Sequence, residues 1–275
     1  MIKDVVVNLA LSAKRDPAGD FAISLAQEFG AHAAGIAFAY EPVIATTMSG
    51  MSSAFIDAQR AESEAAAKAA AERFDAAARR NGLSAETRVL GSTLGGAPEQ
   101  FAGIARRFDL SVIAQAESRK AGPDDLLIEG VLFGSGRPTL VVPYIHTAGL
   151  KLDRVICCWD GSRIAARAIG DATPFLKKSK NVDLLVVETK KVKTAEVTGA
   201  DMGEHLARHG LNVEIKRLVS PDVDIADTIL SYAADAAADL IVMGGYGNSR
   251  LREFVLGGTT RGILATMTVP TVMSH

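Results

Sequence analysis

The chain has 275 residues, a length typical of two domains rather than one. Hydrophobic residues make up 48% and charged residues 23%, a globular composition that excludes a disordered or fibrous chain. The formal net charge of −2 and the aromatic content of 5% provide neither a basic excess nor stacking platforms. We therefore expect no nucleic-acid partner.

Short apolar runs alternate along the chain with segments of helical composition. The expected strands are 5–9, 109–113, 139–142, 155–159, 239–243 and 271–273. The expected helices are 19–30, 53–81, 98–107, 161–177, 196–209 and 223–238. Continuous apolar runs suit strands buried on both faces of a parallel sheet, and Asp222 is the expected N-cap of the last of these helices. The alternation favours an α/β fold built from βαβ units.

The two halves of the chain read as a repeat. Each half opens with an apolar strand and closes with another that follows a proline, Pro138 or Pro270. A repeat of this length indicates a duplicated domain, since solenoid periods are about 20–50 residues. We therefore expect two tandem doubly wound α/β domains, at residues 1–145 and 151–275.

Cysteine content and hydropathy indicate the compartment. Cys157 and Cys158 are adjacent and cannot easily meet disulfide geometry, so we expect thiols in a reducing environment. The first apolar run is interrupted by charges and lacks a cleavage pattern. No stretch approaches the roughly 20 apolar residues of a membrane helix. We expect a cytoplasmic protein without a membrane partner.

A glycine-rich segment follows one of the predicted strands. Met243 ends that strand, Gly244 and Gly247 follow, and after nine further residues Gly257 precedes another expected helix. Open parallel sheets bind ligands outside the carboxyl ends of their strands. Glycines let the backbone approach a phosphate, and a helix amino end attracts anions. A tight turn without a ligand explains the same glycines equally well.

A carboxylate is expected on the same edge of the sheet. Asp160 follows the strand at 155–159 and precedes Gly161 and Ser162. One interpretation makes Asp160 a helix N-cap. The other makes it a group that holds a ribose, an adenine edge or Mg²⁺.

These residues resemble a known family. The pattern G-x-x-G, nine residues, then glycine and a small hydroxyl residue is similar to the signature of the universal stress proteins, with Gly244, Gly247 and Gly257 in register. Gly258 replaces the expected Ser or Thr, and Thr259 comes one place later. The Asp-Gly-Ser at 160–162 and the ending at 267–273 also resemble the family. The likeness covers 151–275, and over 1–145 it rests on architecture.

The resemblance implies, in each domain, a five-stranded parallel sheet of order 3-2-1-4-5 flanked by helices. It implies ATP, or AMP or ADP, as ligand, with Mg²⁺ held through the nucleotide at Asp160 as an option. The nucleotide-binding residues it implies are Asp160, Val187, Glu188, Met243, Gly244, Gly247, Gly257, Gly258 and Thr259. Family members pair through the last strand, so the resemblance also implies an intramolecular pseudo-dimer of the two domains. A further homodimer stays open.

The first half lacks the same residues. When Asp109 is aligned with Asp239, Ala114 and Glu117 occupy the places of the first two glycines. When the opening strands are aligned, Ala10 replaces Asp160. A glutamate would repel a phosphate, so we expect no nucleotide site in residues 1–145. Residues 43–56 form an apolar segment interpreted as disorder, a helix lead-in, a lid or a partner surface.

Other motifs carry less chemistry. His205 and His209 lie four residues apart, as in zinc sites, but without the Glu of a zinc protease or an evident third ligand. Arg250 and Arg252 lie within the glycine-flanked loop and face either phosphates or solvent. We therefore expect no resident metal.

Three functions remain open. The leading interpretation is a stress-response regulatory protein that binds ATP or another adenine nucleotide in its C-terminal domain. The second is a ligand-free interaction protein of the same fold. The third, a slow ATPase, has least support, because phosphoryl transfer needs a positioned base or water. The sequence offers one possible metal carboxylate, no clear base and no P-loop pattern. We expect no catalytic residue.

Overall fold

The computed structural model describes residues 1–11, 15–41, 53–117, 123–188, 199–219, 224–246 and 258–275. The chain divides into two compact units. Unit 1 comprises Met1–Arg137 with Thr147–Gly149, and unit 2 comprises Pro138–His146 with Leu150–His275. Among the described residues, no helix is both long and apolar enough to cross a bilayer.

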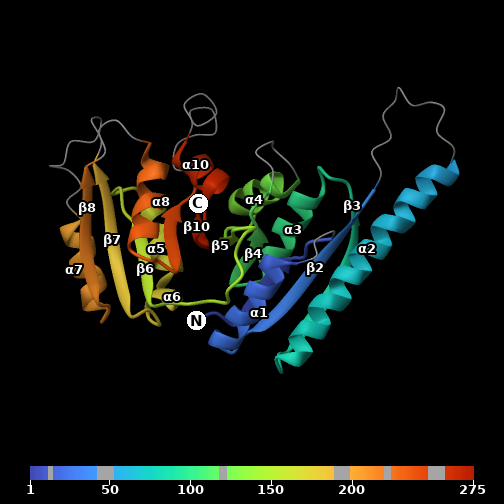
Figure 1. Cartoon of the computed structure of the whole chain (residues 1–275), viewed down its shortest axis with the longest axis horizontal. Helices are drawn as coiled ribbons and strands as arrows, with labels where there is room; N and C mark the ends of the chain where they lie inside the picture. Colours follow the sequence, from blue (N-terminus) through green and yellow to red (C-terminus); the bar gives the residue numbers. More distant parts are fainter. Residues whose placement is uncertain (12–14, 42–52, 118–122, 189–198, 220–223, 247–257) are drawn as a thin grey trace. The chain divides into compact units, whose positions relative to one another are not determined.

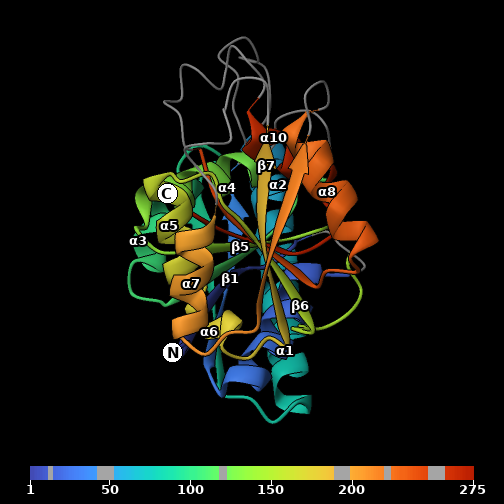
Figure 2. The ribbon, with the colours of Figure 1, turned by 90° about the vertical axis from the view of Figure 1, so that its left-hand side faces the viewer.

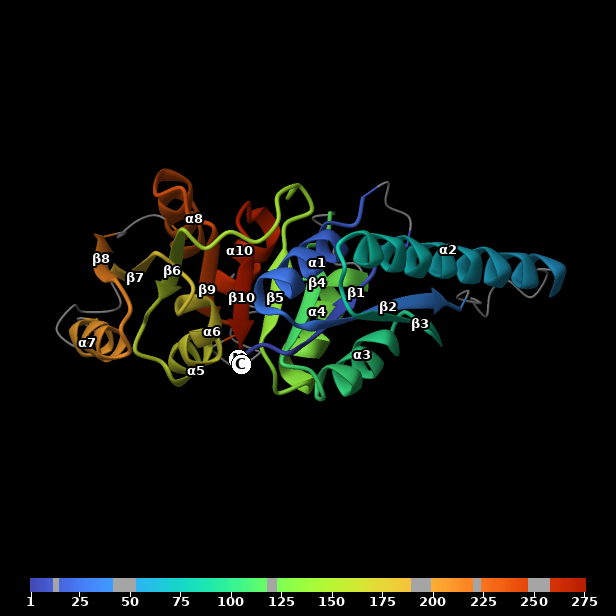
Figure 3. The same cartoon turned by 90° about the horizontal axis from the view of Figure 1, so that it is seen from below.

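Unit 1 is a parallel sheet covered on both faces by helices. Its elements are β1 (Asp4–Asn8), α1 (Pro17–Phe29), β2 (His32–Tyr40), α2 (Ser53–Arg80), β3 (Ala85–Ser92), α3 (Ala97–Ala105), β4 (Leu110–Ala114) and α4 (Pro123–Gly134). The strand order is β3-β2-β1-β4, and all described pairings are parallel. Helices α1 and α2 lie on one face, and α3 and α4 lie on the other (Figure 3).

The core of unit 1 depends on close helix–strand contact. Figure 1 shows α2 running beside β2 and β3. Phe74 of α2 lies over Gly35 of β2, where an added Cβ would come within 2.9 Å of the Phe74 ring. Gly35 therefore permits an approach that any larger residue would block. Helix α2 ends just before Gly82, whose φ of +66° is the left-handed conformation that commonly follows a helix.

Unit 2 has the same layered construction. Its elements are β5 (Thr139–Val142), β6 (Arg154–Cys158), α5 (Arg163–Asp171), α6 (Thr173–Leu176), β7 (Asn181–Glu188), α7 (Ala200–Arg208), β8 (Val213–Val219), α8 (Ile225–Asp235), β9 (Leu240–Gly244), α10 (Thr259–Thr266) and β10 (Thr271–Ser274). The order is β5-β10-β9-β6-β7-β8. Strand β5 runs antiparallel to β10, and the other pairings are parallel. Figure 2 shows α5 and α7 on one side of this sheet and α8 on the other.

The α/β alternation and the mainly parallel pairing confirm the expected fold class. The expected five strands in each of two domains are not confirmed. The described strands divide four to unit 1 and six to unit 2, because β5 pairs with β10 and belongs with unit 2. The segment 139–142 carries the apolar pattern of a buried strand, but that pattern does not specify the pairing partner.

Two helix details differ from expectation. The helix expected over 161–177 is two helices, α5 and α6, and Pro174 lies in the first turn of α6. Proline lacks the N–H that would continue the preceding helix. The N-cap of α8 is Asp224, whose Oδ1 accepts from the Ala226 N–H at 2.7 Å. The expected cap, Asp222, lies outside the described residues.

One contact recurs in both units and supports the internal repeat. In unit 1, Asp109 Oδ2 accepts from the backbone N–H groups of Lys3 and Asp4, at 2.7 and 3.1 Å. In unit 2, Asp239 Oδ2 accepts from those of Asp153 and Arg154, at 2.8 and 3.0 Å. Each aspartate thus accepts hydrogen bonds from backbone N–H groups at the start of the strand that opens its half. This equivalence supports the alignment of Asp109 with Asp239.

Candidate functional site

The winding of unit 2 reverses between β6 and β9. These strands are parallel neighbours, with Cys157 level with Val242, while β7 pairs with the other side of β6. In an open α/β sheet, a crevice forms outside the carboxyl ends of the strands at such a reversal. The residues after Cys158 and after Gly244 therefore flank the place where this fold binds ligands.

Asp160 lies at this edge, two residues beyond β6. Its side chain is exposed, and Oδ1 accepts from the Ser162 N–H at 2.9 Å. Ser162, rather than Asp160, is the N-cap of α5, because its Oγ accepts from the Ala165 N–H at 3.1 Å. Among the described residues, Asp160 Oδ2 has no hydrogen-bond partner. One carboxylate oxygen is thus held by a local turn, and the other is available to a ligand.

The end of β7 lies beside Asp160. The Trp159 N–H donates to the Leu185 carbonyl at 2.8 Å, and Cys158 is level with Leu185. Continuing this register brings Asp160 level with Val187, next to Glu188. Val187 and Glu188, the last two residues of β7, are partly exposed. Asp160 and the end of β7, at Val187 and Glu188, thus lie at the same edge of the sheet on neighbouring strands.

The end of β9 has a structural explanation of its own. Met243 is 4% exposed and belongs to the core. A Cβ on Gly244 would come within 2.7 Å of Ile164 Cγ2 and 3.1 Å of the Ala165 nitrogen. Gly244 therefore lets the first turn of α5 pack against β9, whether or not a ligand approaches.

The chain leaving β9 is anchored to α10 and β10. Tyr246 has a φ of +53°, rare for a residue with a side chain. Its buried N–H donates to Thr260 Oγ1 at 2.9 Å. The Gly245 N–H donates to the Ser274 carbonyl at 2.8 Å, and His275 Nδ1 lies 3.1 Å from the Gly245 carbonyl oxygen. The anchoring role of Thr260 was not predicted, and a hydroxyl in the first turn of the expected helix was the only signal for it.

Among the described residues, the amino end of α10 has no side-chain cap. Gly258 is the N-cap and provides no side-chain hydrogen bond, and Thr259 follows it, partly exposed. The first backbone N–H groups of a helix lack internal partners and favour an anion. Gly247 and Gly257, as well as Arg250 and Arg252, lie outside the described residues, as does most of segment 43–56.

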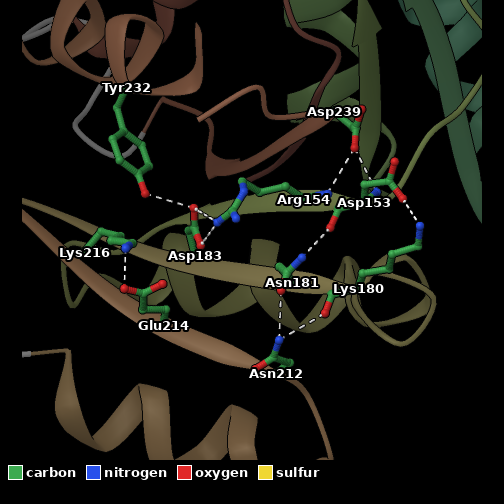
Figure 4. A network of polar contacts seen from close by, with 10 residues as sticks. All are labelled: Asp153, Arg154, Lys180, Asn181, Asp183, Asn212, Glu214, Lys216, Tyr232 and Asp239. Atoms are coloured by element: carbon green, nitrogen blue, oxygen red, sulfur yellow. Dashed lines mark hydrogen bonds and ion pairs between the residues drawn. The ribbon is translucent and has the colours of Figure 1, made fainter. Parts of the chain in front are cut away.

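A polar network at the other end of the strands accounts for the buried charge of unit 2 (Figure 4). Asp183 of β7 is 1% exposed. Arg154 Nη1 lies 2.7 and 2.8 Å from its two carboxylate oxygens, and the Tyr232 hydroxyl donates to Oδ2 at 2.9 Å. Burial and this hydrogen bond raise the pKa of Tyr232, and the carboxylate raises the pKa of Arg154. Every group here has a partner, so the network reads as structural.

In unit 1, the counterpart positions carry no equivalent side chains. Ala10 follows β1, and its N–H donates to Asp16 Oδ2 at 3.2 Å. Its carbonyl accepts from Arg73 Nη2 at 3.1 Å. Ala114 ends β4, and Glu117 is exposed. The absence of a nucleotide site in residues 1–145 stays a prediction.

The histidines and cysteines have ordinary surroundings. The rings of His205 and His209 meet edge to face, with centroids 4.7 Å apart. In the described part of the chain, no group of three or more His, Cys, Asp or Glu side chains could hold a metal ion. Both cysteines are free. Burial raises the pKa of Cys157 and raises that of Cys158 to about 12, so both remain protonated thiols at neutral pH.

Comparison with known proteins agrees with this architecture. Residues 151–275 match the Universal stress protein family. A universal stress protein from Synechocystis sp. is 27% identical over 149 residues, which cover 52% of this chain and 48% of that protein. The match thus spans about half the length of that relative.

Solved structures resemble the fold of the whole chain. A universal stress protein from Archaeoglobus fulgidus DSM 4304 has a TM-score of 0.71 at 18% identity, covering 98% of this chain and 95% of that one. A functionally unknown protein from Pseudomonas aeruginosa PAO1 has a TM-score of 0.63 at 14% identity, covering 99% and 92%. At these identities the likeness concerns the fold alone. Residues 151–275 carry a Universal stress protein family domain.

Proposed function

We propose that the domain at residues 151–275 binds an adenine nucleotide, ATP or its relatives ADP and AMP, and that the protein acts as a stress-response regulator. The observation that carries the proposal is the meeting of Asp160 and the end of β7 at the carboxyl edge, beside the reversal between β6 and β9. The match of this region to the Universal stress protein family supports it.

Each group at this edge suits one part of a nucleotide. Asp160 Oδ2 would accept from a ribose hydroxyl or an adenine amino group, and the backbone at Val187 and Glu188 would face the base. The uncapped amino end of α10, at Gly258 and Thr259, offers N–H donors and a positive dipole end to the phosphates. In this proposal Gly244, Gly247 and Gly257 complete the phosphate loop.

The donor set also fits a magnesium-bound nucleotide. Mg²⁺ is usually held by one or two carboxylates together with substrate phosphates, and Asp160 provides one exposed carboxylate. Bound Mg²⁺ would neutralise phosphate charge. We identify no side chain placed as a general base at this edge among the described residues, so the proposal is binding and signalling rather than turnover.

We extend the proposal to the organisation of the chain. Residues 1–145 would form a domain without a nucleotide site, and the two domains would associate as an intramolecular pseudo-dimer. The antiparallel pairing of β5 with β10 supports such an association. A homodimer through another surface stays open. The two free cysteines support placement in the reducing cytoplasm.

The test is ATP binding by calorimetry with Mg²⁺, using Asp160→Ala. Loss of a hydrogen bond to a charged group costs about 1.5–3 kcal/mol, or about 10- to 100-fold in affinity. Asp235→Ala is the matched control, because Asp235 is exposed at the end of α8, away from this edge. Equal affinity of the Asp160 variant and the unaltered protein would overturn the assignment of Asp160.

A ligand-free interaction protein is the second candidate. It is favoured because two residues at this edge have structural roles that need no ligand. Gly244 leaves room for the first turn of α5, and the Thr260 hydroxyl accepts a hydrogen bond from Tyr246. This reading predicts no ATP binding at millimolar ATP and Mg²⁺, and no effect of Asp160→Ala on partner association. A slow ATPase would additionally require phosphate release that disappears in Asp160→Ala.

A further inference from the structure

A groove between two helices of unit 1 has no role in the proposed nucleotide site. Helices α1 and α2 cover one face of the sheet (Figure 3). The groove is lined by residues of α1 and α2 and by Arg15 and Asp16, and has a volume of about 310 Å³. Ligand pockets in proteins begin at about this volume, roughly 300 Å³. We call it the α1–α2 groove and define it by Arg15, Asp16, Asp20, Arg73 and Arg80.

Small and buried residues make the floor. Gly19 of α1 and Ala70 and Ala77 of α2 line the groove, so no long side chain fills the space between the helices. Ile23 and Phe74 lie below, 5% and 4% exposed. Arg73 and Arg80 are seven residues apart, about two helical turns, and therefore lie on the same face of α2. The groove thus has a small-residue and apolar floor and charged side chains along its rim.

The positive charge of the rim is only partly offset. Asp16 is occupied by backbone donors, since Oδ1 accepts from the Gly19 N–H at 2.9 Å and Oδ2 from the Ala10 N–H at 3.2 Å. Burial raises the pKa of Asp16 to about 6, so its negative charge weakens below neutral pH. The second carboxylate is Asp20, exposed in the first turn of α1.

The three arginines keep donors for a ligand. Arg73 Nη2 donates to the carbonyls of Ala10 and Leu11, at 3.1 and 3.4 Å, which fixes its guanidinium and leaves its other nitrogens without partners in the described part of the chain. Within the same residues, Arg15 and Arg80 make no hydrogen bond or ion pair. All three arginines line one groove, and guanidinium groups bind phosphate oxygens through charge-assisted hydrogen bonds.

We propose that the α1–α2 groove binds a small phosphorylated metabolite, a phosphomonoester with hydroxyl groups. The phosphate lies among the guanidinium groups of Arg15, Arg73 and Arg80, and a ligand hydroxyl donates to Asp20. The site lies in unit 1, so its test does not depend on whether residues 151–275 bind a nucleotide. It gives the half of the chain without a nucleotide site a ligand of its own.

The test uses glucose 6-phosphate and inorganic phosphate as probes, with sulfate as the reference anion. Amide shifts in two-dimensional NMR locate binding, and titration gives the dissociation constant. We expect shifts in α1 and α2, and tighter binding of glucose 6-phosphate than of sulfate. The double variant Arg15→Gln/Arg80→Gln should weaken that binding about tenfold or more. Arg73 is left unaltered because it holds the chain after β1.

A neighbouring arginine provides the matched control. Arg79 lies on α2, pairs with Asp75 at 3.0 Å and does not line the groove. Arg79→Gln should leave binding unchanged. An equal loss in Arg79→Gln would identify nonspecific attraction to a basic helix and overturn the proposal. Glucose 6-phosphate binding no tighter than that of sulfate would also overturn the proposal. So would the absence of amide shifts in α1 and α2 when glucose 6-phosphate is added. Unchanged circular dichroism and melting of the exposed-site variants would confirm that they fold.

Discussion

The hydroxyl of Thr260 holds the start of the glycine-rich loop, and its removal has a calculable cost. Thr260 is 2% exposed and Tyr246 is 6% exposed, and the Tyr246 N–H donates to Thr260 Oγ1 at 2.9 Å. Thr260→Val replaces the hydroxyl with a methyl group of similar size and removes the acceptor of that buried N–H. An unsatisfied buried donor costs about 1–3 kcal/mol. We expect unit 2 to lose about 2 kcal/mol of unfolding free energy.

The assay is urea unfolding followed by tryptophan fluorescence. Trp159 is the single tryptophan of the chain and lies in unit 2, so its emission reports the unfolding of this unit. With a urea dependence of about 2 kcal/mol per molar, the expected loss moves the midpoint down by about 1 M. Thr259→Val is the control, because the Thr259 side chain is partly exposed and makes no hydrogen bond in the described part of the chain. A shift no larger than that of the control would refute the anchoring role of Thr260.

Three further predictions concern buried ionisable groups. Asp183→Asn should destabilise unit 2 by about 3 kcal/mol, because it leaves the Arg154 guanidinium without its buried counter-ion. Tyr232→Phe removes one hydrogen bond to the same carboxylate and should cost about 1 kcal/mol. The tryptophan fluorescence assay measures both. Cys157 and Cys158 should resist alkylation at pH 8 until urea unfolds unit 2, since burial raises both thiol pKa values, and rapid labelling of folded protein would contradict this. The pKa of Asp16, raised to about 6, makes the folded state bind more protons than the unfolded state between about pH 4 and 6. The stability of unit 1 should therefore fall as pH rises through this range, and a carboxyl NMR titration midpoint below 5 would oppose it.

Local pattern predicted six of the described strands, whereas β2, β3, β7 and β8 were not among the expected ones. Parallel strands buried on both faces are continuous apolar runs, and β1, β4, β6 and β9 lie where such runs occur. The break between α5 and α6 was missed because the apolar spacing of a helix continues across it. Pro174 cannot continue the hydrogen-bond pattern of the preceding helix. The apolar pattern of β5 did not specify its antiparallel pairing with β10, which joins segments far apart in the chain. Only the family resemblance, with its pairing through the last strand, implied that contact.

The candidate site was predictable in its position but not in its internal contacts. Chain order alone placed Asp160 at the carboxyl end of a central strand, and the register with β7 agrees. The packing reason for Gly244 depends on where α5 lies. The role of Thr260 depends on the left-handed backbone of Tyr246. Contacts of this kind arise only once separate elements are packed together, so spacing in the sequence does not reveal them.

The central claim is one adenine nucleotide site per chain, in the C-terminal domain. Native mass spectrometry of the freshly purified protein, titrated with ATP and Mg²⁺, measures this stoichiometry directly. We expect a single bound ATP, held about 10- to 100-fold more weakly by Asp160→Ala and with unchanged affinity by Asp235→Ala. Two bound ATP molecules per chain would contradict the absence of a site in residues 1–145. No binding at millimolar ATP would contradict the nucleotide function itself.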